Sequence, residues 1–237
     1  MRERPADFRF TFSGEADRIP FLMDQSAFYL INHYWANLAL DLPMAVASSW
    51  DFWWPFLVVG GLAVLGLGGF RARAMLLAAG LAIGMADGVV VHSLKHLVGR
   101  PRPHEELVGA RTLDLAKAKP RFLALGKPLK EGYSHPGKRP VRGNSFPSGH
   151  AANTFALATV VAVFYRRWGW LAFLPAAVVA YSRIYVGSHW PVDVLASCFL
   201  GAGIALVVVA AFSAAWRKWG GHWLPALHAS HPSLLGR

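Results

Sequence analysis

The sequence predicts an all-α protein that lies in a membrane as a bundle of about five transmembrane helices. Of its 237 residues, 54% are hydrophobic, and the mean hydropathy is +0.34, which is too apolar for an ordinary soluble domain. Several apolar runs reach the length that a spanning helix needs, about 20 residues. The single cysteine, Cys198, excludes a disulfide within the chain. The bilayer is therefore the expected partner of most of this surface.

Residues 1–51 are expected to form an N-terminal amphipathic segment at the membrane interface. They carry seven acids against four arginines, in a chain whose formal net charge is +11. Within residues 19–47, apolar side chains recur at the spacing of one helix face, as at Phe28, Ile31 and Trp35. The acidic and amide side chains between them would be costly at the bilayer centre. We therefore expect a helix lying in the interface, with an imperfect first span as the alternative.

Residues 52–215 form the predicted membrane domain, and residues 216–237 follow as a basic cytoplasmic tail. Tryptophans before the first apolar run and basic pairs after several runs are typical of membrane boundaries. Glycine pairs such as Gly60-Gly61 are expected to permit close helix packing. The predicted spans are residues 52–70, 74–94, 150–165, 169–181 and 191–212.

The second and third spans are separated by a long loop, residues 104–146. It has 43 residues, nine of them basic and four acidic, and connections of this length are usually lids, binding loops or disordered segments. Residues 115–125 have weak helical character, and glycines and prolines interrupt the remainder of the loop. The basic residues are either simply solvated or form an electropositive rim that attracts anionic head groups. The attraction of each such charge to an anionic surface is worth about 1 kcal/mol.

Three polar motifs interrupt the apolar pattern, and alternation of the spans places them at the same membrane face. Lys95 ends the second span, His150 begins the third, and Arg183 and His189 lie between the fourth and the fifth. The opposite face holds short loops with basic residues and no acids, which the positive-inside rule assigns to the cytoplasm. We therefore expect the motifs to face the periplasm or the extracellular side.

The cations and small residues of these motifs are suited to binding a phosphate group. Lys95, Arg102 and Arg183 provide fixed positive charges for phosphoryl oxygens, and a guanidinium group can bind two of them at once. Ser148 is expected at the N-cap of the third span, so that backbone N–H groups near Gly149 point at the same anion.

Two histidines supply the reactive groups. His189 and Asp193 lie about one helical turn apart, so the carboxylate can accept the Nδ1 proton and leave Nε2 as a nucleophile. His150 is the candidate acid for the leaving oxygen, a role worth about 10² to 10⁴-fold. Asp193 is the only acid within the motif cluster, so no acidic metal site is predicted. Arg100 is expected to neighbour the site, and Asp87 to support it through a hydrogen bond.

In order, the patterns Lys-x6-Arg-Pro, Pro-Ser-Gly-His and Ser-Arg-x5-His-x3-Asp resemble the three signature motifs of the type-2 phosphatidic acid phosphatase superfamily, over residues 85–205. The resemblance implies a helical membrane lipid phosphatase without metal or cofactor. It also implies that His189 forms a phosphohistidine, which water hydrolyses with His150 as the base. The related soluble vanadium haloperoxidases share the anion site, but five apolar runs argue against that assignment.

The expected function is hydrolysis of a lipid phosphomonoester or diphosphate at the bacterial inner membrane. Undecaprenyl diphosphate, phosphatidylglycerol phosphate, phosphatidic acid and lipid A phosphate all suit this location, and no motif separates them. The alternative is a non-catalytic lipid-phosphate binder or transporter, which would be expected to lose one of the two histidines. Nucleic acid is not an expected partner, because the basic residues lie at the ends of apolar runs and in one loop.

Overall fold

The structure, a computed structural model, describes residues 15–135 and 144–235, with side chains from Phe21 onward. Residues 1–14 of the predicted N-terminal segment, residues 136–143 of the predicted loop and residues 236–237 of the predicted tail lie outside this description. Within the described ranges, the regular structure is helical except for two short strands. The helical membrane bundle that the sequence predicts is confirmed.

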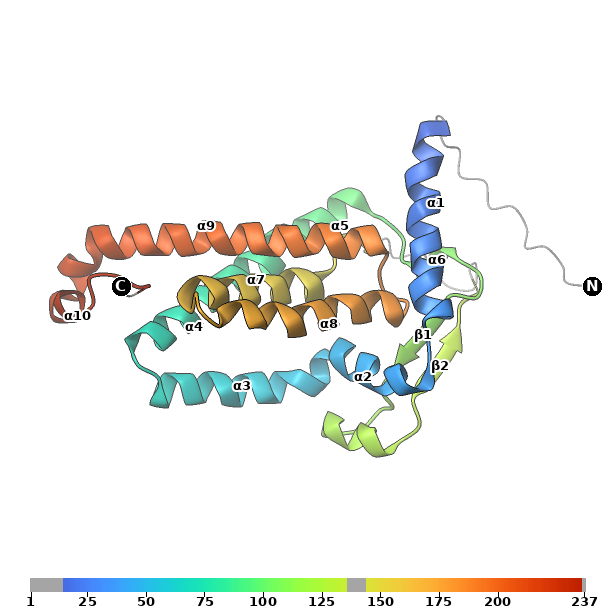
Figure 1. The fold of residues 1–237 in the computed structure, drawn as a ribbon, viewed down its shortest axis with the longest axis horizontal. Coiled ribbons are helices and arrows are strands. Elements are labelled where there is room, and N and C mark those ends of the chain that lie inside the picture. The colour runs from blue at the N-terminus through green and yellow to red at the C-terminus, as the bar shows by residue number, and fades with distance from the viewer. Residues whose placement is uncertain (1–14, 136–143, 236–237) are drawn as a thin grey trace, which may run out of the picture.

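The helices of the bundle run side by side, and some of them continue one another along the bundle (Figure 1). By length and composition, the stretches Trp50–Leu67, Phe70–Glu106 and Pro191–Trp223 are sufficient to cross a membrane, and Gly149–Phe164 is a shorter apolar helix. The columns that these helices form are α3 (Trp50–Leu67); α4 (Phe70–Met85) continued by η2 (Ala86–Val91) and α5 (His92–Val98); α7 (Gly149–Phe164); η4 (Gly169–Ala172) followed by α8 (Phe173–Tyr185); and α9 (Pro191–Trp223).

Helix α7 is the centre of the bundle and contacts α4, α8 and α9. Alanines of α4 and α7 line these contacts together with Ala205 of α9, because small side chains let helix backbones approach closely in a membrane. The approach is closest at Gly201, where a Cβ would clash with the carbonyl oxygen of Ala152. The prediction for Gly60-Gly61 is wrong, since a Cβ at either position would meet none of the described atoms within 4 Å.

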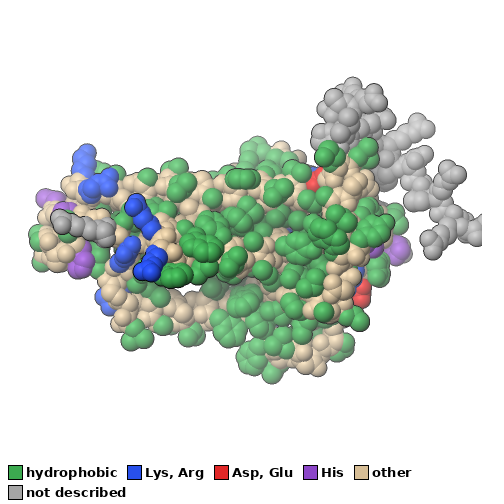
Figure 2. All heavy atoms as spheres, viewed as in Figure 1, with side chains coloured by type: hydrophobic (Ala, Val, Ile, Leu, Met, Phe, Trp, Pro, Cys, Tyr) green, Lys and Arg blue, Asp and Glu red, His purple; other side chains and the backbone are tan. Residues whose placement is uncertain are grey.

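Hydrophobic side chains cover the middle of the bundle, and Lys and Arg side chains gather at one end (Figure 2). The basic end holds the turn between α3 and α4 and the short helix α10 (Pro225–Ser230). Large apolar side chains such as Leu62, Leu81 and Val207 are about half exposed or more. Lipid tails solvate such a surface as well as protein does, whereas water does not. The bundle therefore presents the surface of a membrane protein.

The N-terminal region differs from the single interfacial helix expected over residues 19–47. It forms two helices, α1 (Glu15–Tyr29) and α2 (Leu38–Ser48), joined by the π turn η1 (Leu30–Tyr34). The second helix restarts because the side chain of Asn37 accepts a hydrogen bond from a first-turn N–H and caps it.

Helix α1 runs across the end of the bundle instead of along it (Figure 1). Phe28 on its inner face is buried against Trp190, with 5.6 Å between the ring centroids. Leu22 and Met23 on the outer face are exposed. Trp35, expected in line with Phe28, is also exposed because the helix has already ended. An apolar outer face on a helix that crosses the spans suits the membrane interface.

The long loop contains an antiparallel hairpin that the sequence does not predict. Strand β1 (Arg111–Asp114) pairs with β2 (Lys130–Tyr133), with Arg111 opposite Tyr133. The connection between them includes the 3-10 helix η3 (Arg121–Gly126), which overlaps the second half of residues 115–125, where weak helical character is expected. The short helix α6 (Pro103–Glu106) precedes the hairpin.

Arg111 fastens this hairpin to the rest of the protein. Its guanidinium group donates to Asp41 and to Glu131, each at 2.6 Å, and the Tyr185 hydroxyl donates to the same Asp41 at 2.6 Å. The fully buried Asn32 donates to the carbonyl oxygens of Arg111 and Tyr185. The polar groups that are expected to keep the N-terminal segment at the interface therefore include buried partners of the hairpin. Breaking such a buried pair typically costs about 3–5 kcal/mol, so the hairpin is held firmly.

The predicted tail is folded against the bundle in its described part. Helix α9 continues to Trp223, beyond the predicted end at residue 212. Leu234 is only 3% exposed and packs in the cluster formed by α4, α7 and α9. The indole N–H of Trp216 donates to the carbonyl oxygen of His231 at 2.8 Å, which holds the returning chain in place.

Candidate active site

The three polar motifs meet at the end of the bundle opposite the basic turns. Lys95 lies in the last turn of α5, His150 in the first turn of α7 and Arg183 in the last turn of α8. His189 lies in the turn before α9. Lys95, Arg102 and Arg183 are close enough for their positive charges to act on both imidazoles. The structure thus brings together side chains from four separate segments, as alternation of the spans predicts.

His189 is buried and held in one tautomer. The residue is 3% exposed, and its Nδ1 lies 2.6 Å from the carbonyl oxygen of Ser145. A carbonyl oxygen can only accept a hydrogen bond, so Nδ1 carries the proton and Nε2 keeps its lone pair. This contact fixes the tautomer, while burial and the charge of Arg183 lower the pKa of His189 and so favour the neutral imidazole, in which Nε2 is available.

The predicted partner of His189 is wrong, because Asp193 does not take the Nδ1 proton. Its carboxylate accepts from Arg100 at 2.5 Å and from the Ser145 hydroxyl at 2.6 Å. It also accepts from the backbone N–H of Trp190 at 3.4 Å, across the first turn of α9. A fully buried carboxylate needs a cation and several donors, and Arg100 supplies the cation. Asp193 and His189 are therefore both hydrogen-bonded to Ser145 and not to each other in the contacts of the described residues.

Three buried polar atoms of the motifs have no hydrogen-bond partner among the residues that the structure describes. They are Nε of Arg183, Nε2 of His150 and Oγ of Ser148. The remainder of the Arg183 guanidinium group is anchored by Ser48, whose carbonyl oxygen accepts at 2.9 Å and whose hydroxyl also accepts. An unsatisfied buried polar group costs about 1–3 kcal/mol. Three of them in one cluster indicate a place for a polar ligand.

At the start of α7, other parts of the protein come close to the helix backbone. Ser148 occupies the predicted N-cap position, but its hydroxyl does not cap the helix. Its N–H donates to the hydroxyl of Ser197 at 2.8 Å. A Cβ on Gly149 would lie 3.0 Å from Oδ1 of Asp87, so the carboxylate lies against the helix start. The charge of Asp87 acts on Lys95, which places Asp87 beside the site, and its supporting hydrogen bond stays a prediction.

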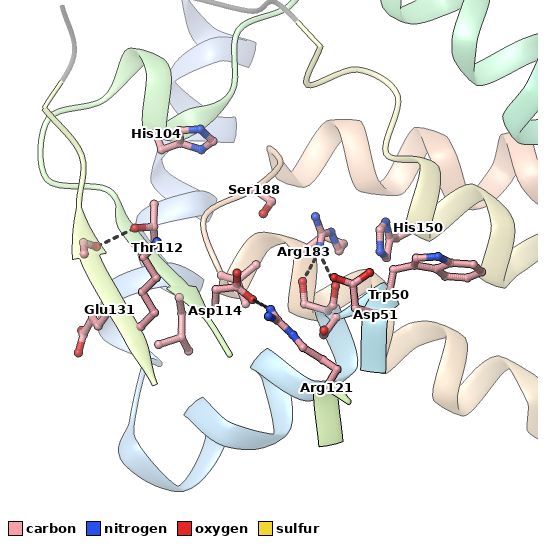
Figure 3. A pocket seen from close by; sticks show the side chains of 16 residues that line it. Trp50, Asp51, His104, Thr112, Asp114, Arg121, Glu131, His150, Arg183 and Ser188 are labelled. Carbon is pink, nitrogen blue, oxygen red and sulfur yellow. Dashed lines mark hydrogen bonds and ion pairs between the residues drawn. The ribbon is translucent and has the colours of Figure 1, made fainter. Parts of the chain in front are cut away.

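A cavity of about 490 Å³ opens beside His150 and Arg183 (Figure 3). Its walls come from the junction of α2 and α3, from both strands of the hairpin and from the turn before α9. Polar side chains dominate the lining, including Asp51, Thr112 and Ser188. Hydroxyl, carboxylate and basic groups suit a polar head group better than an acyl chain. Within the described ranges, no group of three or more His, Cys, Asp or Glu side chains is placed to hold a metal ion.

The sequence does not predict the roles of three groups that contribute to the site. The Ser145 carbonyl carries no sequence signal, because every residue has one. Ser48 lies 135 positions from Arg183, and nothing local marks it as a guanidinium anchor. Arg100 stands two residues before Arg102 in the same motif. That proximity signals a neighbour of the site, but not the partner of Asp193.

The pKa of His189 leads to a prediction about pH. Burial, together with the charges of Arg183 and Arg102, holds this pKa well below the ordinary 6.5. In the unfolded chain the same imidazole takes up a proton near pH 6.5, so folding stability should fall as the pH drops below that value. We expect His189 to contribute a loss of about 1 kcal/mol between about pH 7.5 and about pH 5.5.

The measurement is thermal unfolding in detergent at both pH values, for the wild type and for His189→Asn. Asparagine can still donate to the Ser145 carbonyl but does not titrate, so this variant should lose less stability on acidification. An equal loss in both proteins would contradict the neutral, desolvated imidazole.

The site therefore consists of two histidines and a group of cations at the polar end of a helical membrane bundle. Residues 73–217, a stretch that includes all three motifs, match the PAP2 superfamily. Since this match covers more than half of the chain, the protein belongs to the PAP2 superfamily. The family assignment drawn from the motifs is confirmed.

Several known proteins are similar to parts of this chain. The undecaprenyl-diphosphatase of Sulfolobus acidocaldarius is 42% identical over 66 residues, which cover 27% of this chain and 32% of that protein. The lipid A 4'-phosphatase of Bacteroides thetaiotaomicron is 41% identical over 61 residues, covering 25% and 27%. These matches span about a third or less of the relatives' length. The crystal structure of Aquifex aeolicus LpxE shares the fold, with a TM-score of 0.53, 24% identity and coverage of 79% of this chain and 95% of that one.

Proposed function

We propose that this protein hydrolyses the phosphate group of a membrane lipid through a phosphohistidine on His189. The observation that carries the proposal is the cluster of Lys95, Arg102 and Arg183 around a buried imidazole whose Nδ1 proton is taken by a backbone carbonyl. A neutral Nε2 beside three cations is the arrangement that nucleophilic attack on a phosphate requires.

The reaction runs in two steps. In the first, His150 carries a proton taken up when the anionic substrate binds beside the cations. Nε2 of His189 bonds to phosphorus, the bond from phosphorus to the leaving oxygen breaks, and His150 gives that oxygen its proton. In the second, His150 takes a proton from water as the water oxygen bonds to phosphorus. The bond from phosphorus to Nε2 of His189 breaks, inorganic phosphate leaves, and His150 is again protonated. The cations neutralise the charge on the phosphoryl oxygens in both steps. The unpartnered Nε of Arg183 and Oγ of Ser148 are further candidates to bind those oxygens.

The substrate proposed is a lipid phosphomonoester or diphosphate. Undecaprenyl diphosphate and lipid A phosphate are favoured by what the similar proteins are named for, and phosphatidylglycerol phosphate and phosphatidic acid carry the same reactive group. The polar cavity next to His150 would receive the head group, while the apolar chains remain in the bilayer. Phosphate release from each of the four lipids, measured with the purified protein, tests the activity itself. Binding of all four without release would favour a non-catalytic lipid-phosphate binder or transporter.

Activity should persist in excess EDTA, because the proposed mechanism uses histidines and fixed cations. The measurement is phosphate release with and without the chelator, using the best lipid of the panel. Orthovanadate should inhibit, since it mimics the five-coordinate phosphorus beside His189. If EDTA abolished turnover and Mg²⁺ restored it, the metal-free mechanism would be wrong.

The proposed location is a bacterial inner membrane, with the site on the periplasmic or extracellular side. The end opposite the site carries basic residues in short turns, which the positive-inside rule places in the cytoplasm. Figure 2 shows Lys and Arg side chains gathered at that end. By their positions in the chain, the basic residues near this end of the helices are Arg71, Arg73, Arg166, Arg167, Arg217 and Lys218.

This orientation predicts which introduced cysteines react in intact cells. Ser134 is buried, so the better probe in the loop is the exposed Lys117, changed to cysteine in a Cys198→Ser background. It should react with a membrane-impermeant maleimide, whereas cysteine at the exposed Arg166 should react only after the membrane is opened. The reverse labelling pattern would place the site in the cytoplasm.

A further inference from the structure

Helix α1 places a buried acid beside the machinery of the site. Asp24 is 4% exposed, although its neighbours Leu22 and Met23 are largely exposed on the outer face of the same helix. Its Oδ1 accepts the backbone N–H of Val192 in the first turn of α9, at 3.0 Å. The N-terminal helix is thereby attached to the helix that comes directly after the proposed nucleophile.

The other oxygen of Asp24 begins a chain of short contacts. Oδ2 accepts from Nη2 of Arg100 at 2.6 Å, and Nη1 of the same guanidinium donates to Asp193 at 2.5 Å. The Arg100 guanidinium also lies over the Trp190 ring, 5.0 Å from its centroid. Arg100 is therefore fixed between two buried carboxylates and an aromatic face, with both ends of its fork engaged.

The series of hydrogen bonds continues through Ser145 to His189, the proposed nucleophile. The Ser145 hydroxyl donates to Asp193 at 2.6 Å, and the N–H of the same residue donates to the carbonyl oxygen of Arg100 at 2.8 Å. Its own carbonyl oxygen accepts the Nδ1 proton of His189 at 2.6 Å. The position of that carbonyl sets the direction of Nε2, so whatever holds Ser145 also aims the imidazole.

We propose that Asp24 is a positioning residue for His189, acting through Arg100, Asp193 and Ser145. The inference rests on the proposed function of His189 as the nucleophile. Without the Asp24 charge, Arg100 loses one of its two anchors and can rotate away from Asp193, which loosens Ser145. The phosphate-binding cations are not part of this hydrogen-bond network, so substrate binding is unaffected. The imidazole of His189 is less well oriented for attack on phosphorus.

Asp24→Asn should lower kcat by about 10-fold, as is usual when a partner that orients a reacting group is removed, and leave KM unchanged. The matched control is Tyr29→Phe, which removes a different α1 contact, the hydroxyl bond to the carbonyl oxygen of Val108. That control should keep the wild-type kcat. A changed KM with an unchanged kcat, or an equal loss in Tyr29→Phe, would overturn the assignment.

A double-mutant cycle separates positioning from simple destabilisation. Ser145→Ala removes the hydroxyl that donates to Asp193 and so breaks the hydrogen-bond network between Asp193 and the Ser145 carbonyl. Asp24→Asn should therefore have little further effect on kcat in that background. Multiplying effects would show that Asp24 acts by another route and would refute the proposal.

A spectroscopic readout tests the same coupling without turnover. The Nδ1 proton of His189, assigned in NMR spectra with His189→Asn, should shift in Asp24→Asn and stay in place in Tyr29→Phe. An unmoved signal in Asp24→Asn would overturn the positioning role even if no lipid were hydrolysed. A shifted signal in a protein that releases no phosphate would leave the positioning intact and refute the proposed activity.

Discussion

Replacing His189 with alanine should abolish both turnover and covalent labelling by a phosphate-labelled substrate. We expect a loss of about 10⁴-fold or more in kcat, because removing a nucleophile eliminates the first chemical step. Lys95, Arg102 and Arg183 remain, so the variant should still bind the lipid. The measurements are phosphate release, retention of label on the denatured protein, and calorimetric binding of the lipid in detergent.

One variant controls for damage to the fold, and a second gives a graded effect. His189→Asn preserves a donor for the Ser145 carbonyl and should be equally inactive while unfolding near the wild-type temperature. Asp193→Asn should show an intermediate rate, since Asp193 touches Ser145 and Arg100 but not His189. Label that persisted on His189→Ala would mean that another residue forms the covalent bond.

The membrane fold and the meeting of the motifs are both readable from the sequence. Apolar runs of spanning length identify α3, the column from α4 to α5, and α9, because hydropathy depends on composition alone. Alternation of those runs then puts Lys95, His150, Arg183 and His189 at one end, and the structure does so. The ends of the helices are less predictable. Helix α9 continues past residue 212 to Trp223 because the chain keeps packing against α10 and α4.

The hydrogen-bond partners inside the site are not readable in the same way. Spacing of four residues suggests that Asp193 holds Nδ1 of His189. The buried carboxylate of Asp193 instead pairs with the cation of Arg100. The group that accepts from Nδ1 of His189 is the carbonyl oxygen of Ser145, 44 positions from His189. Spacing along one helix says nothing about backbone groups that arrive from another segment.

In the N-terminal region, too, the sequence does not reveal the partners of the polar residues. Asp24, Asn32 and Asp41 look like the polar face of an interfacial helix when partners are ignored. In the fold each is buried and paired, with Arg100, with the backbone of Arg111, and with the Arg111 side chain. Hydropathy counts the cost of a polar group but not the partner that offsets it.

Replacing His150 with alanine should separate the two steps of the reaction. The imidazole of His150 is the proposed acid for the leaving oxygen, and its buried Nε2 has no partner among the described residues. A lipid phosphate with a poor leaving group should therefore react about 10² to 10⁴-fold more slowly. An activated aryl phosphate needs little protonation as it leaves, so its first step should keep most of its rate.

The same variant should then trap the intermediate. Because His150 also takes the proton from water in the second step, labelled phosphoenzyme should accumulate with the aryl phosphate. The measurements are the rates for both substrates and the fraction of labelled protein after quenching. His104→Ala is the matched control, because it removes another imidazole from the same cavity and should slow both substrates alike without accumulating label. Equal slowing of both substrates in His150→Ala would refute its role as the acid, and absence of the trapped intermediate would refute its role as the base.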